Sequence, residues 1–224
     1  MIMLSFIAIM MAAYLVGSIP TSIIAGKVLR GRDFDIRRHG SGNAGGTNVF
    51  RVLGWKPGLA VMAFDVVKGV VATLLVSHWQ PFGAVYLNAT VLQILAGMAA
   101  VCGHIWTIFA GFRGGKGVGT AGGMIIGLYP IAALLCFVVF ILVVFFTRYV
   151  SLGSILAAVS LPLVLLLLPA PSPQTDSDVL FLFSLLVCGL IVYTHRGNIR
   201  RLLKGTENRF GKRRAPASMS PMHE

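Results

Sequence analysis

The sequence predicts an all-α polytopic membrane protein with seven transmembrane helices, and three observations carry this prediction. Hydrophobic residues make up 56% of the 224 residues and charged residues only 12%, which is about half the charged share of soluble domains. Several apolar runs reach the roughly 20 residues that an α-helix needs to cross a bilayer. The basic residues are confined to alternate loops between these runs. We therefore expect a single membrane domain.

The apolar runs define the candidate spans. They cover roughly residues 2–25, 57–78, 83–103, 117–129, 130–147, 152–169 and 178–194. The first run lacks the basic start and the cleavage site of a signal peptide, so we expect a retained helix. Run 117–129 is the weakest candidate, because a helix of that length reaches only about 20 Å against a hydrocarbon core of about 30 Å. We keep it as a crossing, because omitting it would place the basic tail outside the cell.

The basic residues indicate the orientation of the chain. Every Lys and Arg except Lys68 lies in loops 26–56, 104–116 and 148–151 or after residue 195. Loops 79–82 and 170–177, on the opposite side, contain none. Because Lys and Arg collect on the cytoplasmic side of membranes, we expect the amino terminus outside and the carboxyl terminus in the cytoplasm. The net charge of +12 therefore reflects membrane orientation and gives no reason to expect a nucleic-acid partner.

A transmembrane domain over residues 1–210 and a disordered basic cytoplasmic tail over 211–224 complete the expected organisation. The three cysteines, Cys102, Cys136 and Cys188, lie within apolar runs, where they are expected to be small buried hydrophobic residues. The histidines have no metal-ligand spacing and carboxylates are few, so we expect neither a metal nor a cofactor.

The first polar loop carries a glycine-rich segment, Gly40-Ser41-Gly42-Asn43-Ala44-Gly45-Gly46-Thr47-Asn48, with Arg51 one turn further on. Backbone N–H groups in such a segment form anion-binding nests, and its hydroxyl and amide side chains add hydrogen-bond donors. The dinucleotide pattern G-x-G-x-x-G is matched formally, but that fingerprint needs a preceding strand, and the flanks here are membrane helices. The segment predicts a phosphate or carboxylate site. The alternative is a merely flexible polar loop.

A second glycine turn is Arg113-Gly114-Gly115-Lys116-Gly117-Val118-Gly119-Thr120. It departs from the Walker A pattern at Ala110 and at Gly117, where that pattern has Gly and Ser or Thr. Lys116 nevertheless precedes an expected helix, whose free N–H groups and dipole favour an anion. This predicts a second phosphate site. The alternative is a cytoplasmic anchor combined with close helix packing.

The carboxyl-terminal segment offers a third polar group. His195, Asn198 and Arg201 share one face if the last helix continues past the membrane. Such a face would orient a phosphate or a hydroxyl group of a substrate. Glu207 lies among basic residues, and we expect it to be an ion-pair partner that fixes local structure.

Two further pairs have alternative interpretations. Asp65 and Lys68 lie one turn apart at membrane depth, where charged residues are either functional or neutralise each other. Ser151 and Ser154 follow Arg148 at a helix start, where Ser151 is either an N-cap or part of a ligand-facing pair.

Together these segments resemble the bacterial membrane acyl-phosphate:glycerol-3-phosphate acyltransferases of the PlsY type. The matching pieces occur in order over residues 17–208: Gly17-Ser-Ile-Pro20, Gly40-Ser-Gly-Asn43, Thr47-Asn48, Arg51-Val-Leu-Gly54, Asp65-Val-Val-Lys68-Gly69, Gly103-His104, Gly114-Gly-Lys-Gly117, Arg148-Tyr-Val-Ser151-Leu-Gly-Ser154, His195, Asn198-Ile199 and Glu207. The resemblance implies seven transmembrane helices and an active site on the cytoplasmic side of the bacterial inner membrane.

The motifs described above and the resemblance together give expected roles for individual residues; the resemblance itself points to Ser41, Arg51, residues 114–117, His195, Asn198 and Glu207. The expected catalytic residues are Ser41, Arg51, Lys116, His195 and Asn198, and the expected structural residues are Asp65 and Glu207. The expected substrate-binding residues are Gly42, Asn43, Gly45, Thr47, Asn48, Lys68, Gly114, Gly115, Gly117, Ser151, Ser154 and Arg201. Gly46 and Gly119 stand where the family pattern has alanine, and we expect them to loosen their loops.

The implied reaction joins the acyl group of acyl phosphate to the 1-hydroxyl of glycerol 3-phosphate, as the first committed step of phospholipid synthesis. Lysophosphatidate (1-acyl-glycerol 3-phosphate) and phosphate are the expected products. Acyl phosphate already carries a good leaving group, so we expect direct transfer without an acyl-enzyme, with the proton taken by His195 or by a substrate phosphate. The expected partners are the two substrates and membrane lipid.

Three alternatives remain at this point. An acyl-CoA-dependent acyltransferase usually carries a His-x-x-x-x-Asp motif, which is absent after His39, His104 and His195. A transporter of an organic phosphate would also use glycine-broken helices, but the polar groups cluster on one side only. A purely structural membrane scaffold leaves the three polar motifs unexplained.

Overall fold

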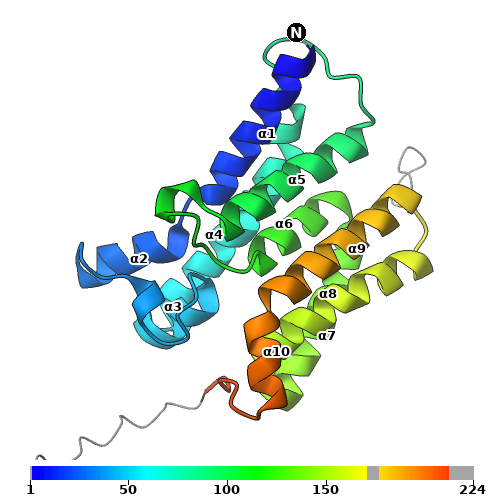
Figure 1. The fold of residues 1–224 in the computed structure, drawn as a ribbon. Helices are drawn as coiled ribbons and strands as arrows, with labels where there is room; N and C mark the ends of the chain where they lie inside the picture. Colours follow the sequence, from blue (N-terminus) through cyan, green and yellow to red (C-terminus); the bar gives the residue numbers. More distant parts are fainter. Residues whose placement is uncertain (1, 171–176, 212–224) are drawn as a thin grey trace, which may run out of the picture.

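The computed structural model describes residues 2–170 and 177–211, and the regular structure of this part of the chain is entirely helical (Figure 1). The expected tail lies, from residue 212 onward, outside the described residues. The α-helices are α1 (Ile2–Ser18), α2 (Thr21–Arg30), α3 (Gly46–Leu53), α4 (Trp55–Leu74), α5 (Ala89–Ile105), α6 (Val118–Leu128), α7 (Pro130–Thr147), α8 (Val150–Leu167), α9 (Ser177–Thr194) and α10 (Arg196–Leu203).

Six stretches of the described chain are long and apolar enough to cross a membrane, which confirms the all-helical membrane class. They are Ile2–Arg30, Trp55–His78, Ala89–Ala110, Pro130–Thr147, Val150–Leu167 and Ser177–Thr194. The expected span 117–129 corresponds to α6, which has only 11 residues. It packs against α4, α5 and α7, and these neighbours fix its place in the bundle.

Two expected spans have different boundaries in the structure. The run 2–25 is not one helix, because α1 ends at Ser18 and α2 begins at Thr21. Pro20 lies between them, and a proline lacks the N–H group that a continuous helix would need there. The run 83–103 starts too early: α5 begins at Ala89, with the Asn88 side chain accepting a hydrogen bond from the backbone N–H of Thr90.

The helices pack in two groups. In one group α1 lies against α5 and α4 against α6, and in the other α8 lies between α7 and α9. Glycines let α4 and α6 approach closely, since a Cβ on Gly123 would lie 1.9 Å from the Val66 carbonyl oxygen. In Figure 1 α2, α3 and α10 all lie toward the end of the bundle opposite the amino terminus, with α10 apart from α2 and α3.

Gly46 and Gly119 stand at helix contacts and not in free loops. A Cβ on Gly46 would lie 2.4 Å from Met62 Cγ, and a Cβ on Gly119 would lie 3.0 Å from Asp65 Cβ. Both glycines therefore permit close packing against α4, and the expectation that they loosen their loops is wrong.

Candidate active site

An open pocket of about 330 Å³ lies among three segments that are far apart in the sequence. The residues that line it are Ser41, Gly42, Asn43, Lys116, Thr194, Arg196, Gly197, Asn198, Arg200 and Arg201. The structure thus brings together one residue group from each of the three polar motifs. Sequence reasoning missed the contributions of Thr194, Arg196, Gly197 and Arg200, although their proximity to Asn198 in the chain was a usable signal.

The Ser41 loop is shaped by left-handed glycines and held from inside by Asn48. Gly40 has φ +62° and Gly42 has φ +74°, which glycine adopts at no steric cost. The Asn48 side chain is only 1% exposed. Its Oδ1 accepts a hydrogen bond from the Ser41 N–H at 2.8 Å, and its Nδ2 donates to the carbonyls of Ile36 and His39 at 3.2 and 2.9 Å.

This geometry corrects the expected role of Asn48. The sequence predicts that its amide donates to a substrate, but both N–H groups of the amide donate to backbone carbonyls, those of Ile36 and His39. Gly45 and Thr47 are also absent from the pocket lining: Gly45 is the N-cap of α3, and Thr47 lies in its first turn. Asn48 therefore shapes the loop, and Ser41, Gly42 and Asn43 are the residues that reach the pocket.

The backbone N–H groups of the two glycines before Lys116 do not face the second phosphate site that the sequence predicts. The N–H of Gly114 donates to the Ile105 carbonyl at 2.9 Å, and the N–H of Gly115 donates to the His104 carbonyl at 3.1 Å. These two groups are therefore used by the end of α5 and are not available to a phosphate. Gly117 has φ +82° and is the N-cap of α6, so the expected placement of Lys116 at a helix start is found.

Lys116 lies in the open pocket, and its ammonium donates a hydrogen bond to Asn198 Oδ1. Burial lowers the pKa of Lys116 to about 8, while the negative charge of Glu207 acts in the opposite direction. The positive charges of Arg201 and Arg51 lower the pKa further. Arg51 is exposed in the last turn of α3 and does not line the pocket, but its charge is near enough to influence Lys116.

The last helix does not continue unbroken past His195, which was the condition for one shared face with Asn198 and Arg201: α9 ends at Thr194 and α10 starts at Arg196. His195 is 3% exposed and does not line the open pocket. Its Nδ1 lies 2.8 Å from the Ile191 carbonyl oxygen. A carbonyl only accepts, so Nδ1 carries the hydrogen and Nε2 the lone pair. Burial and the nearby Lys116 charge lower the pKa of His195 to about 4.

Glu207 connects α10 to α8. Its Oε1 accepts hydrogen bonds from Asn198 Nδ2 at 2.8 Å and from Ser151 Oγ at 3.1 Å, and its Oε2 accepts from Arg201 Nε at 2.7 Å. The ion pair that the sequence suggests for Glu207 is therefore present, with Arg201 as its partner. Ser154 instead donates to the Val150 carbonyl at 3.0 Å, so neither serine hydroxyl has the ligand-facing position that we considered.

We expect Glu207→Ala to lower the free energy of unfolding by about 2 kcal/mol, because it leaves buried donors without their acceptor. The effect is smaller than for a fully buried pair, since Arg201 is 40% exposed. Thermal unfolding of the detergent-purified protein measures it, with the exposed Asp33→Ala as the matched control. A melting temperature equal to that of the control would contradict this role.

A salt-bridged arginine joins the walls of the site. Arg37 forms a bidentate pair with Asp35, with Nη2 2.9 Å from Oδ2. Its Nη1 donates to the carbonyls of Ala110 and Arg113 at 2.8 and 3.2 Å. The loop that carries Ser41 is thereby attached to the loop that carries Lys116. The Arg37 hydrogen bond also holds the pKa of Asp35 below its usual value. Sequence reasoning counted Arg37 only as a basic loop residue.

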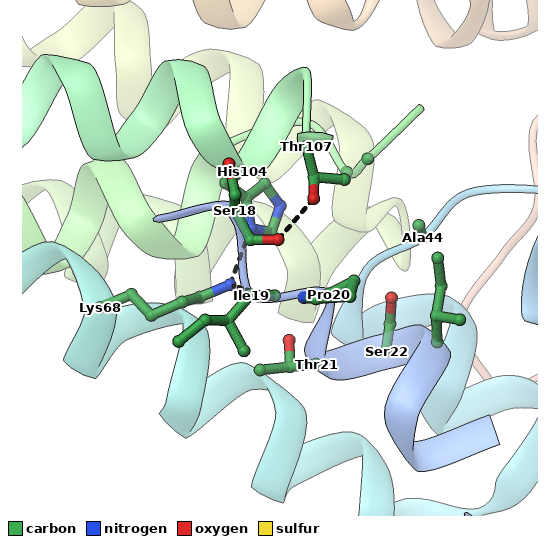
Figure 2. Close-up of a pocket in the computed structure, with 12 residues that line it drawn as sticks. Ser18, Ile19, Pro20, Thr21, Ser22, Ala44, Lys68, His104 and Thr107 are labelled. Carbon is green, nitrogen blue, oxygen red and sulfur yellow. Dashed lines mark hydrogen bonds between the residues drawn. The ribbon is translucent and has the colours of Figure 1, made fainter. Parts of the chain in front are cut away.

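A second, much smaller pocket of about 10 Å³ lies beside the break between α1 and α2 (Figure 2). Lys68, Gly114 and Gly115 line this pocket and not the open one. Lys68 forms an ion pair with Asp65 at 2.8 Å, so the neutralising contact that the sequence suggests is present.

Among the residues in the described ranges, no group of three or more His, Cys, Asp or Glu side chains is arranged to hold a metal ion.

Comparisons with known proteins identify the family. Residues 7–205 match the family model described as glycerol-3-phosphate acyltransferase. Glycerol-3-phosphate acyltransferases of Chlorobaculum parvum and Chlorobaculum tepidum are 51% and 50% identical to this chain, and each alignment covers 94% of this chain and 100% of the relative.

Two crystal structures of PlsY (YgiH), an integral membrane glycerol 3-phosphate acyltransferase, have the same fold. The glycerol 3-phosphate form has a TM-score of 0.76 and the lysophosphatidic acid form 0.75, each at 36% identity over 92% of this chain and 96% of the other. Together with an all-helical membrane fold and a basic pocket built from three polar motifs, these similarities show that the chain belongs to the glycerol-3-phosphate acyltransferase family.

Proposed function

We propose that this protein transfers a fatty acyl group from acyl phosphate to the 1-hydroxyl of glycerol 3-phosphate. The observation that carries the proposal is the open pocket in which Ser41, Lys116 and Asn198 converge among basic side chains. Both substrates carry a phosphate that is largely dianionic near neutral pH. A pocket that contains Lys116, Arg196, Arg200 and Arg201 matches that charge.

In the proposed reaction the glycerol 1-hydroxyl oxygen attacks the acyl carbonyl carbon. The new C–O ester bond forms, the bond from the acyl carbon to the phosphate oxygen breaks, and inorganic phosphate leaves with lysophosphatidate as the other product. No acyl-enzyme is needed. The hydroxyl proton goes to a substrate phosphate, because the His195 ring is buried and does not line the pocket.

Different side chains act on the two substrates. Lys116 binds the phosphate of glycerol 3-phosphate, and Arg51 and Arg201 add positive potential near it. Asn198 holds Lys116 through its Oδ1 and is itself oriented by Glu207. Ser41 and Asn43 donate to the oxyanion that develops on the acyl carbonyl, the contact with the largest expected effect on rate.

The orientation of the chain is part of the proposal. Every described Lys and Arg except Lys68 lies in the segments 26–56, 104–116 and 148–151 or after residue 195, and the residues of the open pocket come from these same segments or directly precede them. Because Lys and Arg collect on the cytoplasmic side, this distribution supports a site that faces the cytoplasm from a bacterial inner membrane. This orientation requires α6 to serve as a seventh, short crossing. Its close packing against α4 and α5 supports such a crossing, because surrounding protein tolerates elements too short to span lipid alone.

The direct test is an assay of the purified protein in detergent or lipid with glycerol 3-phosphate and either acyl phosphate or acyl-CoA. We expect lysophosphatidate from acyl phosphate only. Product from acyl-CoA alone would overturn the donor assignment. Product from neither donor would overturn the proposed enzyme activity, provided that the protein is folded by its thermal transition.

The pH dependence should report Lys116. Lys116 binds the substrate phosphate only while its ammonium is charged. The value of kcat/KM for glycerol 3-phosphate should therefore fall as pH rises through about 8, the pKa of Lys116 in the enzyme without substrate. His195 stays neutral above about pH 4 and adds no second limb near neutrality. In Lys116→Arg the alkaline decline should move to higher pH, and an unchanged decline would assign it to another group.

A further inference from the structure

Three ionisable side chains form a cluster inside the helical bundle that none of the roles above uses. They are Asp65 and Lys68 on α4 and His104 on α5, which are 4%, 5% and 8% exposed. Lys68 Nζ lies 2.8 Å from Asp65 Oδ1. His104 Nδ1 lies 3.4 Å from Nζ and 3.5 Å from Oδ1. Charged side chains at membrane depth are costly, and their retention needs an explanation.

Lys68 is hydrogen-bonded within the protein. Its ammonium faces the carbonyls of Gly17 at 3.4 Å and Ile19 at 2.9 Å, in addition to Asp65 and His104. An ammonium has three hydrogens, and three oxygen acceptors surround this one: the two carbonyls and the Asp65 carboxylate. Lys68 does not line the open pocket, and its ammonium bonds to the protein itself; direct binding of a substrate by Lys68 stays a prediction.

The carbonyls that Lys68 binds are those of the break between α1 and α2. Pro20 interrupts the helix there, so carbonyls before it lack their usual helical partners. Thr21, the first residue of α2, donates to Asp65 Oδ1 at 2.7 Å. In addition, Thr107 donates to the Ser18 carbonyl, as Figure 2 shows beside Lys68 and His104. The cluster thus fixes the break to α4 and α5.

His104 extends this cluster to the lysine loop. The Gly115 N–H donates to the His104 carbonyl at 3.1 Å. A Cβ on Gly115 would lie 2.2 Å from His104 Nε2, so the imidazole packs directly against the Gly115 backbone. The next residue is Lys116, whose side chain lies in the open pocket. A shift of the imidazole therefore moves the residue that carries the phosphate-binding ammonium.

Stability alone does not account for such a cluster. The cost of burying two charges is repaid only in part by their attraction, and apolar residues of similar volume often replace a buried ion pair without loss of stability. What apolar residues cannot supply is a set of directed hydrogen bonds. Here those bonds fix the break, the imidazole and the lysine loop relative to one another.

We infer that Asp65, Lys68 and His104 are positioning residues that hold Lys116 at the depth and direction needed to bind glycerol 3-phosphate. The inference rests on the proposed function, because it uses Lys116 as the residue that binds that phosphate. Misplacement of a substrate-positioning group by about 1 Å costs roughly 100-fold in rate. Loss of the cluster should therefore affect binding and catalysis more than folding.

The test is the double variant Asp65→Leu/Lys68→Met, which replaces the ion pair by apolar side chains. We expect kcat/KM for glycerol 3-phosphate to fall by about 10- to 100-fold, while the melting temperature in detergent stays within a few degrees of the wild type. Lys27→Met, at an exposed lysine of α2, is the control and should retain full activity. Full activity of a folded double variant would overturn the inference.

A double-mutant cycle with Lys116 tests whether the cluster acts by positioning Lys116 or affects activity independently of it. In a Lys116→Ala background the double substitution should cause less than about a twofold further loss, because residues that act as a unit are non-additive. Equal losses in both backgrounds would overturn the inference. If the double variant does not fold, His104→Asn, which keeps the ion pair, is tested in the same cycle with the same expected coupling.

The outcome is separable from that of the proposed function. The kinetics are measured with whichever acyl donor the wild type uses, so a wrong donor assignment leaves the cycle intact. The rise in melting temperature that glycerol 3-phosphate causes in the wild type needs no turnover, and it should be reduced in the double variant. A wild type that makes no lysophosphatidate counts against the proposed function only, and a double variant with a full ligand-induced rise counts against the positioning role.

Discussion

Replacing Lys116 with alanine should raise the KM for glycerol 3-phosphate about 100-fold and lower kcat by less than tenfold. Removing one member of a buried, hydrogen-bonded charge pair costs about 2–5 kcal/mol, and each 1.4 kcal/mol is a factor of ten. Lys116 is the charged side chain that enters the pocket from the α6 start. Steady-state kinetics with varied glycerol 3-phosphate at saturating acyl phosphate measure the change.

Lys204→Ala is the matched control, because Lys204 is exposed at the end of α10 and its loss should leave both constants unchanged. A Lys116→Ala variant with normal KM and a kcat lowered 100-fold would contradict the assigned role. That result would mean that the Lys116 ammonium stabilises a charge that develops only in the transition state.

Replacing Ser41 with alanine should lower kcat about 100-fold and change the KM for glycerol 3-phosphate by less than threefold. A donor that stabilises a developing oxyanion contributes about this much to the rate, and it adds little to binding of the ground state. The backbone N–H of Ser41 still reaches Asn48 Oδ1 in the variant, since that 2.8 Å bond needs no serine side chain. The loop geometry should therefore be retained.

Ser177→Ala serves as the control, because this exposed serine starts α9, whose other end leads into the pocket. Single-turnover measurements separate the chemical step from product release. A Ser41→Ala variant with normal kcat but a much higher KM for either substrate would make Ser41 a binding residue and exclude the oxyanion role.

The sequence predicted the elements that depend on local composition. Apolar runs identified all six long spans, and glycine with hydroxyl, amide and basic residues identified the three segments that meet in the open pocket. These predictions succeed because hydropathy and loop composition are properties of contiguous residues. The helix break was missed although Pro20 was visible, because the hydropathy of residues 2–25 is continuous across it.

Which polar groups remain available to a ligand was not predictable from the sequence. Asn48 and Gly114 both have the right chemistry for a phosphate, yet the first is used by the carbonyls of its own loop and the second by the end of α5. The role of His104 was also not predictable, because it depends on contacts with residues of another helix. Its partners Asp65 and Lys68 lie on another helix, and spacing along the chain carries no information about contacts between helices.

The bond pattern of Arg37 has a consequence for variation among related chains. Its guanidinium binds two backbone carbonyls, those of Ala110 and Arg113, and backbone carbonyls are present whatever side chain a position carries. As far as these two hydrogen bonds are concerned, residues 110 and 113 are therefore free to change. Positions 35 and 37 are not, because their attraction depends on an acid facing an arginine. Substitutions should therefore be tolerated on the side of this contact that supplies the carbonyls, and not on the side that supplies the arginine and its acid.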